Sequence, residues 1–512
     1  MIAKIGDIYV VYEERLQQYA ACQVIRIKEQ ASSRHKVLAA VLELDWHSDQ
    51  LPTEVELQHI KPLVCNYYFW NDRWDYSFVD ANVPKHYRLV GNIPPLIEAE
   101  CNSYASWRTG GSLYRQLQWE AIPAELRARF KAAAGSDEQV NIAGFPAKLS
   151  TSTIRQGALE QLEDWSELHK LPCLTAIHTS HPYKPELIDY LRDTPFITEL
   201  SLDDPRATEL DFTGTSLNRL ILKADDVESL TLPKGLSQLS LVGTVSEKLR
   251  IYAEHDGKEL LLMVDKQATS HYGLSQLGAL NIRGVADIDL AELAGQFPHL
   301  HELRIWGAPG YAANMGKIVK LIGLHTFTTY DLFGFTGEEF PLPDTLPQLS
   351  MLWLDSLPAD AAKTIKARYK KAAASGLDLS VTKPRKPEWM AENLTNPFRD
   401  WDGREHITST NAKKAMNLYK KMLGELGALE KQAASGMNAA EVHAALAALV
   451  TDFTATLNKM DSRSGFIETI EREEIYEVLH DLLKNTKLNL AESGIKVDLD
   501  KLIDIFDAER DF

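Results

Sequence analysis

Carboxylates near the C-terminal end of the sequence have the residue type and spacing most suggestive of chemistry. Glu468, Glu471, Glu474 and Glu477 recur at three-residue steps, and acidic residues outnumber basic ones in residues 461–512. Carboxylates on facing helices can hold divalent metal ions that activate water, so one interpretation is a metal-dependent hydrolase. A strict three-residue step, however, drifts around a helix of 3.6 residues per turn. We therefore expect a solvated helix face, with no catalytic residue and no metal site.

A second group of charged and aromatic residues surrounds a predicted turn at residues 396–406, which contains Trp401 and Arg404. These two side chains could act in catalysis or could hold a linker in place. We favour the structural interpretation, in which Trp401 anchors the linker and Arg404 pairs with a carboxylate. The glycine turn at residues 109–112 is a weak candidate for phosphate binding, because no strand–helix setting surrounds it.

Motifs of the common enzyme classes are missing from the sequence. It contains no GxxxxGK[ST] phosphate loop, no GxGxxG after a predicted strand, no GxSxG elbow and no HExxH helix. We therefore expect a protein without enzymatic activity and without a cofactor.

Charge and composition narrow the class of partner. The 512 residues include 55 Lys+Arg and 72 Asp+Glu, a formal net charge of −17, with an ordinary hydrophobic content of 45%. Nucleic acid and anionic membranes select basic surfaces, so neither is the expected partner. No secretory signal pattern or membrane-spanning apolar segment is recognisable. The four cysteines are too scattered for a zinc ribbon or a disulfide framework, so we expect a cytoplasmic protein.

The elements that must position these residues begin with a β-rich segment, residues 1–95, for which we expect a small β-barrel-like domain or a curled sheet. Its aromatic residues, including Trp70 and Trp74, could form a binding surface, although filling a small β core is the favoured interpretation. Gly-Asp-Ile-Tyr at residues 6–9 and Arg-Leu-Val-Gly-Asn at residues 88–92 resemble the immunity protein 26 family. That resemblance implies an SH3-like β fold and a place in bacterial toxin-immunity loci.

Leucines repeat through the centre of the chain with the pattern LxxLxL. Six pairs of apolar residues follow one another at steps of nine or ten residues, from Leu200 and Leu202 to Leu249 and Ile251. From Leu280 and Ile282 onward, the full units recur at steps of 23 to 25 residues, enough for a strand and a helix. The short period predicts one strand and one tight return per unit, so that successive strands stack in parallel into a solenoid. Residues 171–385 resemble the leucine-rich repeat family.

Helical segments flank the solenoid. Residues 96–170 indicate a helical connector and solenoid cap, with a helix at 123–134. Residues 386–512 indicate a separate α-helical bundle with the helices 410–431, 439–459, 466–483 and 499–506. The fold class we expect is therefore a multidomain α/β protein: a β domain, a leucine-rich solenoid and a helical bundle.

Residues that flank the inward leucines line the open, concave face of such a solenoid. Trp, Tyr and Arg are frequent there, and these residue types dominate protein-binding hot spots. We expect a partner-binding surface formed by Tyr252, Arg283, Arg304, Trp306, Tyr330, Trp353 and Asp355. The earlier units place acidic residues such as Glu199, Asp203, Glu209 and Asp211 at the same positions. The C-terminal domain could instead fold back and cover this face.

The sequence thus favours a protein-binding protein of bacterial origin, which in its most concrete form neutralises a toxin or effector with a basic surface. A regulatory or anti-phage defence scaffold that senses a ligand through the solenoid is the alternative, and the metal-dependent hydrolase is the third. The oligomeric state stays open.

Overall fold

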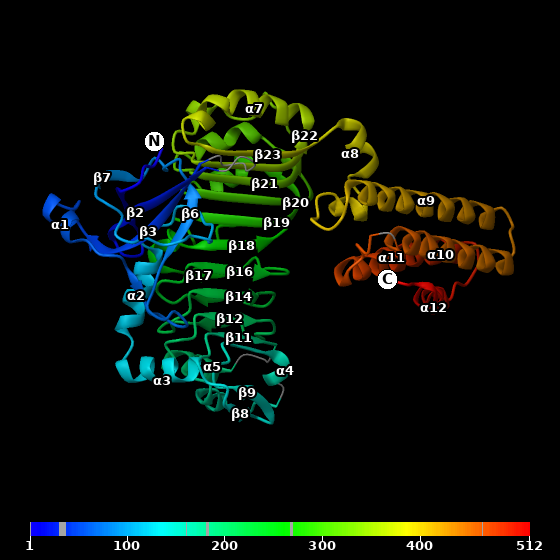
Figure 1. Ribbon diagram of the computed structural model, residues 1–512. Coiled ribbons are helices and arrows are strands. Elements are labelled where there is room, and N and C mark those ends of the chain that lie inside the picture. The colour runs from blue at the N-terminus through cyan, green and yellow to red at the C-terminus, as the bar shows by residue number, and fades with distance from the viewer. Residues whose placement is uncertain (1, 30–36, 160, 181–183, 267–269, 463) are drawn as a thin grey trace. The chain divides into compact units, whose positions relative to one another are not determined.

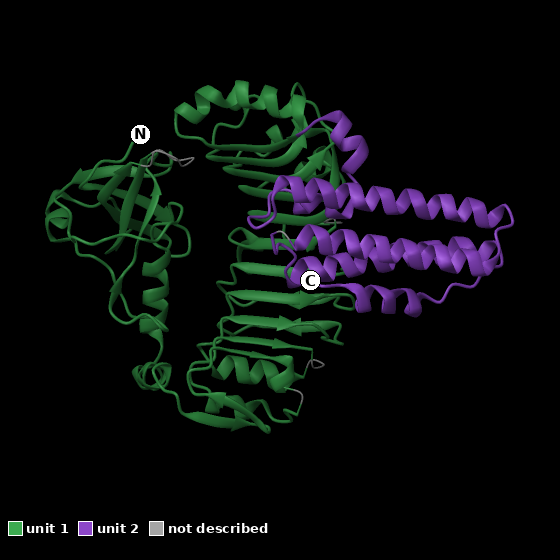
Figure 2. Cartoon of the chain, turned by 45° about the vertical axis from the view of Figure 1, so that its right-hand side comes forward, with its two compact units in different colours: residues 1–384 green, residues 385–512 purple. Residues whose placement is uncertain are grey.

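The computed structural model describes residues 2–29, 37–159, 161–180, 184–266, 270–462 and 464–512. The chain forms two compact units, Met1–Pro384 and Arg385–Phe512 (Figure 2). The first unit contains an antiparallel sheet, a connector and a solenoid-type parallel sheet, and the second is helical (Figure 1).

Antiparallel strands form the N-terminal part of the first unit. Among the described residues, five strands are ordered β6-β3-β2-β1-β7. Their bounds are β1 Asp7–Glu13, β2 Gln18–Glu29, β3 Val37–Ser48, β6 Tyr76–Asp80 and β7 Arg88–Asn92. Successive side chains of β1 alternate between two hydrophobic clusters, one on each face of the sheet. The expected barrel-like domain is therefore an antiparallel sheet with β6 and β7 at its edges.

The two segments that carry the family resemblance lie side by side in this sheet. β1 pairs with β7, which places Asp7 opposite Asn92. Asn92 Nδ2 donates a hydrogen bond of 2.9 Å to Asp7 Oδ1. Short elements complete this region: α1 Glu54–His59, β4 Val64–Cys65 and β5 Arg73–Trp74.

Helices connect the sheet to the solenoid. α2 (Gly111–Ala121) and α3 (Ala124–Ala134) are followed by the hairpin of β8 (Gln139–Ile142) and β9 (Phe145–Lys148). The strand β10 (Thr153–Arg155) already pairs in parallel with the next strand of the solenoid. The parallel sheet therefore begins inside the segment that the sequence assigned to the connector.

The solenoid is built on one large sheet. Among the described residues it holds eleven strands in the order β10-β11-β12-β14-β16-β18-β19-β20-β21-β22-β23 (Figure 1). Neighbouring strands from β10 to β22 pair in parallel, and equivalent residues of each repeat lie opposite one another. The bounds after β10 are β11 Ala176–Thr179, β12 Glu199–Leu202, β14 Arg219–Lys223, β16 Gln238–Val242, β18 Leu261–Asp265, β19 Ala279–Asp289, β20 Glu302–Ala313, β21 Thr326–Phe333, β22 Met351–Pro358 and β23 Asp378–Arg385.

Every second unit of the ten-residue repeat belongs to a different sheet. β13 (Glu209–Asp211), β15 (Ser229–Thr231) and β17 (Arg250–Tyr252) pair with one another in a small parallel sheet. The prediction that successive short units stack in one sheet is therefore wrong. Two units form one coil, which contributes one strand to each sheet. The alternation of inward leucines is the same in both strands of a coil, so the pattern could not separate them.

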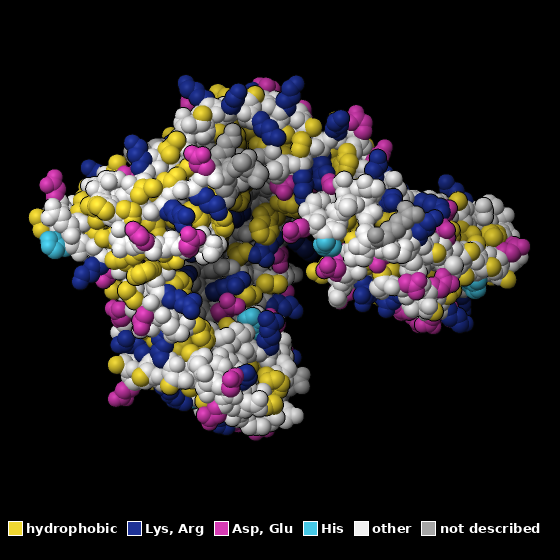
Figure 3. Space-filling model, viewed as in Figure 1, with side chains coloured by type: hydrophobic (Ala, Val, Ile, Leu, Met, Phe, Trp, Pro, Cys, Tyr) yellow, Lys and Arg dark blue, Asp and Glu magenta, His cyan; other side chains and the backbone are white. Residues whose placement is uncertain are grey.

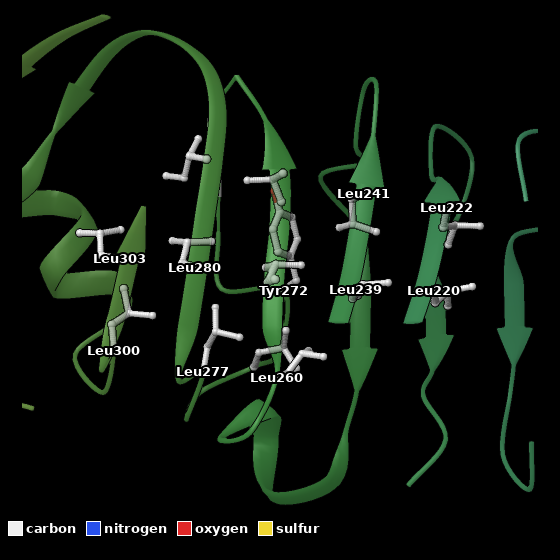
Figure 4. Close-up of a cluster of buried hydrophobic side chains, with 14 of the residues drawn as sticks. Leu220, Leu222, Leu239, Leu241, Leu260, Tyr272, Leu277, Leu280, Leu300 and Leu303 are labelled. Carbon is white, nitrogen blue, oxygen red and sulfur yellow. The ribbon is translucent and has the colours of Figure 1, made fainter. Parts of the chain in front are cut away.

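The repeated leucines form the core between the strands and the rest of each coil. Figure 4 shows these side chains stacked from strand to strand, including Leu239 and Leu241 of β16, Leu280 of β19 and Leu303 of β20. All four are almost completely buried. Each buried leucine contributes about 1.5–3 kcal/mol through apolar area removed from water. The coils are thus held together by a continuous core that no single coil could form.

The coils before β12 and those after β17 return through helical segments. These are the α-helices α4 Gln156–Leu159, α5 Pro185–Asp193, α6 Leu290–Gln296 and α7 Ala359–Ala374, and the 3-10 helices η1 Trp165–Lys170, η2 Glu254–Gly257, η3 Met315–Lys320 and η4 Pro343–Thr345. The strand and helix that the longer repeat spacing predicts are both present in the unit of β22 and α7.

The second unit is α-helical. It contains α8 Pro387–Asn393, the 3-10 helix η5 Pro397–Trp401, α9 Ser409–Ala434, α10 Ala439–Asp461, α11 Thr469–Glu492 and α12 Leu499–Glu509. Asn438 caps α10 with a capping box that includes Glu441. α11 begins three residues later and ends nine residues later than predicted. Among the described residues, no helix has both the length and the apolar content that a membrane crossing requires.

Candidate functional site

The large sheet presents its second face away from the leucine core, and we call this the open face. Because side chains alternate along a strand, the residue between the two inward side chains and the residue after them both stand on the open face. The inner row is Ser240, Met263, Asn281, Arg304, Thr328 and Trp353. The outer row is Asp265, Arg283, Trp306, Tyr330 and Asp355.

Aromatic side chains make the open face suitable for protein binding. Trp306 and Trp353 expose 37% and 38% of their surface, although both lie within regular strands. The guanidinium of Arg283 lies over the Trp306 ring, 5.3 Å from its centroid. An Arg–Trp contact of this kind fixes both side chains in advance, which lowers the entropy cost of binding. The structure thus brings together six of the seven residues expected on this surface.

Tyr252 is the exception. It lies on β17, which belongs to the small sheet, so it does not stand beside Arg283 or Trp306. Glu209, Asp211 and Arg250 lie on the small sheet as well. The prediction that Tyr252, Glu209 and Asp211 share the open face is wrong, because the coil contains two strands of similar pattern.

Two acidic residues at the N-terminal end of the open face, Glu199 and Asp203, already have partners within the protein. Glu199 accepts a hydrogen bond from Arg219, at 3.3 Å, and contacts His178 Nε2 at 2.9 Å. Asp203 contacts the hydroxyls of Ser180 and Ser201. Basic and acidic side chains are also interspersed over the visible surface of the first unit (Figure 3). The negative net charge is therefore not concentrated at this end.

The N-terminal aromatic residues mainly fill a core. Tyr67 and Cys65 are buried in a cluster with Trp119 of α2, Phe130 of α3 and Phe196 of the solenoid, and Trp70 packs against this cluster. Trp74 is exposed on the short strand β5. Trp70 thus has a structural role at the join between the sheet and the solenoid.

The glycine turn at residues 109–112 is occupied by carboxyl groups of the protein itself. Gly110 N donates a hydrogen bond of 2.8 Å to Glu43 Oε2 at the start of α2. Ser112 Oγ donates to Asp75 Oδ2. Burial raises the pKa of Glu43 to about 8, and the nearby Asp75 adds to this effect. A turn whose Gly110 N–H already binds a carboxyl group of the protein is poorly suited to phosphate binding.

The stability of Glu43→Gln relative to the wild type is expected to increase as the pH rises, because of a change in the first unit. The amide keeps an oxygen for Gly110 N–H, but it cannot ionise. In the wild type the folded state keeps a proton on Glu43 up to pH about 8, whereas the unfolded chain loses it near 4.5. As the pH rises from about 4.5 to about 8, the free energy of unfolding of the wild type therefore falls relative to that of the variant. The expected slope is about 1.4 kcal/mol per pH unit.

Urea unfolding of both proteins at pH 5, 7 and 9 measures this difference. Glu98→Gln, at an exposed position, is the control for replacing a glutamate by glutamine at the protein surface. A constant difference between Glu43→Gln and the wild type would show that Glu43 is ionised throughout.

Residues 396–406 contribute a buried cluster in the second unit. Trp401 is fully buried and its Nε1 donates to Glu474 Oε2 at 2.8 Å. Arg404 donates to Glu471 Oε1 and, at 2.6 Å, to Glu474 Oε1. His406 Nε2 lies 3.2 Å from Glu471 Oε1. The cluster joins the linker segment to α11.

Glu471 is only 1% exposed, so the expectation that this series forms a solvated helix face is wrong for this residue. Burial favours the protonated carboxyl, but the hydrogen bonds from Arg404 and from the Glu468 backbone outweigh it and hold the pKa of Glu471 below its usual value. Among the described residues, no group of three or more His, Cys, Asp and Glu side chains could hold a metal ion.

Asn281 is a residue of the open face that sequence reasoning missed. It is 3% exposed, and its Oδ1 has no hydrogen-bond partner among the described residues. Its position between Leu280 and Ile282 is the signal that could have identified it, because alternation places it opposite the core. Met263 lies beside it in the inner row.

Comparison with known proteins gives little further guidance. No protein-family model matches the sequence, and no curated protein matches it. One similar solved structure is internalin C2 from Listeria monocytogenes, with 16% sequence identity and a TM-score of 0.21. The similarity covers 45% of this chain and 92% of the internalin chain.

Proposed function

We propose that this protein binds a protein partner through the open face of its large sheet and has no catalytic activity of its own. The observation that carries the proposal is the pair of part-exposed tryptophans, Trp306 and Trp353, on a regular sheet face. Tryptophan in the centre of an interface typically contributes 2 kcal/mol or more to binding. A sheet held by the continuous leucine core is a rigid support for such residues.

The most concrete form of the proposal is an immunity protein that acts in the bacterial cytoplasm and covers the active surface of a toxin. What supports this form is the resemblance of residues 6–9 and 88–92 to an immunity family, together with their pairing in one sheet. The net charge of −17 would speed association with a basic toxin surface.

Co-expression with the protein encoded beside this gene in its native genome tests the proposal. We expect the wild type to co-purify with that protein and to restore growth of cells that produce it. Trp306→Ala and Trp353→Ala should each weaken the complex about 30-fold. Tyr252→Ala is the matched control, because Tyr252 is exposed but lies on the small sheet.

Two outcomes would contradict the proposal. A wild type that neither binds the neighbouring protein nor protects cells rejects the toxin-neutralising form. If Tyr252→Ala weakens the complex as much as Trp306→Ala does, the open face is not the binding site.

A further inference from the structure

Arg283 carries a positive charge that the protein does not neutralise. No carboxylate among the described residues lies within ion-pair distance of it, although Asp265 is its neighbour across β18 and β19. Asp265 instead accepts a hydrogen bond from Gly243 N at 3.2 Å. Arg304, in the inner row, differs because its Nε lies 2.6 Å from Glu302 Oε1.

The Arg283 side chain is nevertheless held in place. Its guanidinium packs over Trp306, and one terminal nitrogen lies 3.4 Å from Met263 Sδ, a weak acceptor. Arg283 Nε and the neighbouring Asn281 Oδ1 are buried and have no hydrogen-bond partner within the described parts of the chain. The packing against Trp306 and Met263 therefore fixes the Arg283 side chain without an ion pair to a carboxylate of the described residues.

Asp355 is the corresponding negative group in the same row. Within the described parts of the chain, its Oδ1 is buried without a hydrogen-bond partner, and no basic side chain forms an ion pair with it. Asp355 lies opposite Tyr330, which in turn lies opposite Trp306. From Arg283 to Asp355 the outer row therefore runs from a cation, across two aromatic rings, to an anion, and Asp265 precedes Arg283 in the row.

The strand spacing sets the distance between these charges. Arg283 is on β19 and Asp355 is on β22, three strand spacings away, or about 14 Å. An extended peptide advances about 3.3–3.4 Å per residue, so four residues cover the same distance.

We propose that the open face binds an extended segment of the partner in which an acidic residue and a Lys or Arg are four positions apart. The acidic side chain pairs with Arg283, and the basic side chain pairs with Asp355. The apolar side chain midway between them packs over Trp306 and Tyr330, because side chains of an extended segment alternate between its two faces. This inference rests on the proposed function and adds the chemistry of the partner.

Labelled peptides and the full-length chain test the inference. The probe peptide carries the sequence Glu-Leu-Phe-Leu-Lys between Gly-Ser flanks, and two controls carry Glu or Lys at both charged positions. By fluorescence anisotropy, we expect the probe to bind at least about tenfold more tightly than either control, because like charges oppose each other in the controls.

Charge reversal should change the preferred peptide instead of only weakening binding. Arg283→Glu makes both ends of the row acidic, so the peptide with two lysines should become the tightest ligand. Asp355→Lys makes both ends basic, so the peptide with two glutamates should become the tightest. A gain of this kind cannot result from misfolding.

Equal affinity for the three peptides, or an unchanged preference in both variants, would overturn the inference. A different result would contradict the proposed function. A partner complex that depends on Trp306 and Trp353, but tolerates Arg283→Glu and Asp355→Lys, retains the function and rejects the charge spacing. A complex that tolerates the tryptophan substitutions rejects the function itself.

Discussion

Replacing Arg404 by alanine is expected to lower the free energy of unfolding of the second unit by about 3–5 kcal/mol. The substitution leaves the Glu471 carboxylate buried and removes the guanidinium that neutralises it. Uncompensated buried charge is among the most destabilising changes that a single substitution can make. Hydrogen exchange of α9 and α11 in the full-length chain measures the loss, because these helices form the core of this unit.

The pH dependence gives an independent check on this cluster. The lowered pKa of Glu471 means that its ionised form stabilises the folded state above the usual value of 4.5. That contribution disappears as the pH falls through the folded pKa. The difference between Arg404→Ala and the wild type should therefore shrink on acidification below 4.5.

Two further variants separate the buried charge from a general loss of packing. Lys421→Ala removes an exposed ion pair with Asp452, 2.7 Å in length, and should change stability little, because water and salt screen exposed pairs. Arg404→Met combined with Glu471→Gln should recover part of the loss, because it removes both charges. If the double variant is as unstable as the sum of the single variants, the Arg404–Glu471 interaction is not the cause.

Replacing Leu280 by alanine is expected to destabilise the solenoid by about 2–5 kcal/mol. Leu280 is completely buried between Leu262 of β18 and Leu303 of β20. The regular strands on both sides prevent the neighbouring side chains from closing the cavity that the substitution leaves. Because each coil contacts only its neighbours, the increase in hydrogen exchange should be largest in β18–β20 and should decline along the sheet.

Ile322→Ala is the control for this experiment. Ile322 is an apolar residue of the same unit that is largely exposed, so its replacement should change exchange little. Uniform exchange across the solenoid in Leu280→Ala would contradict the expected nearest-neighbour behaviour and would indicate one fully cooperative unit.

The sequence predicts the parallel strands well because one repeated pattern encodes them. Leu200, Leu220 and Leu239 occupy equivalent inward positions, as their spacing predicts. The same pattern fails to assign Leu210 and Leu230 to a second sheet, since an inward leucine is required in both sheets. Only the tertiary path of the coil decides which sheet a given strand joins.

Long-range partners were the part of the site that sequence could not predict. Arg404 was expected to pair with a carboxylate, but its partners Glu471 and Glu474 are 67 and 70 positions away. Glu43 lies 67 positions from the turn that it caps. These contacts depend on how separate elements pack, and the spacing of residues within one segment does not predict that packing.

The in-register stacking of the large sheet has a consequence for how the open face can evolve. Any two groups in the same row of the open face are separated by a whole number of strand spacings, each about 4.8 Å. Gain or loss of one coil between Arg283 and Asp355 would shift their separation by one such increment and leave every side chain in its local setting. Unequal recombination within the repeats could therefore alter which ligands fit, in discrete steps and without a point mutation.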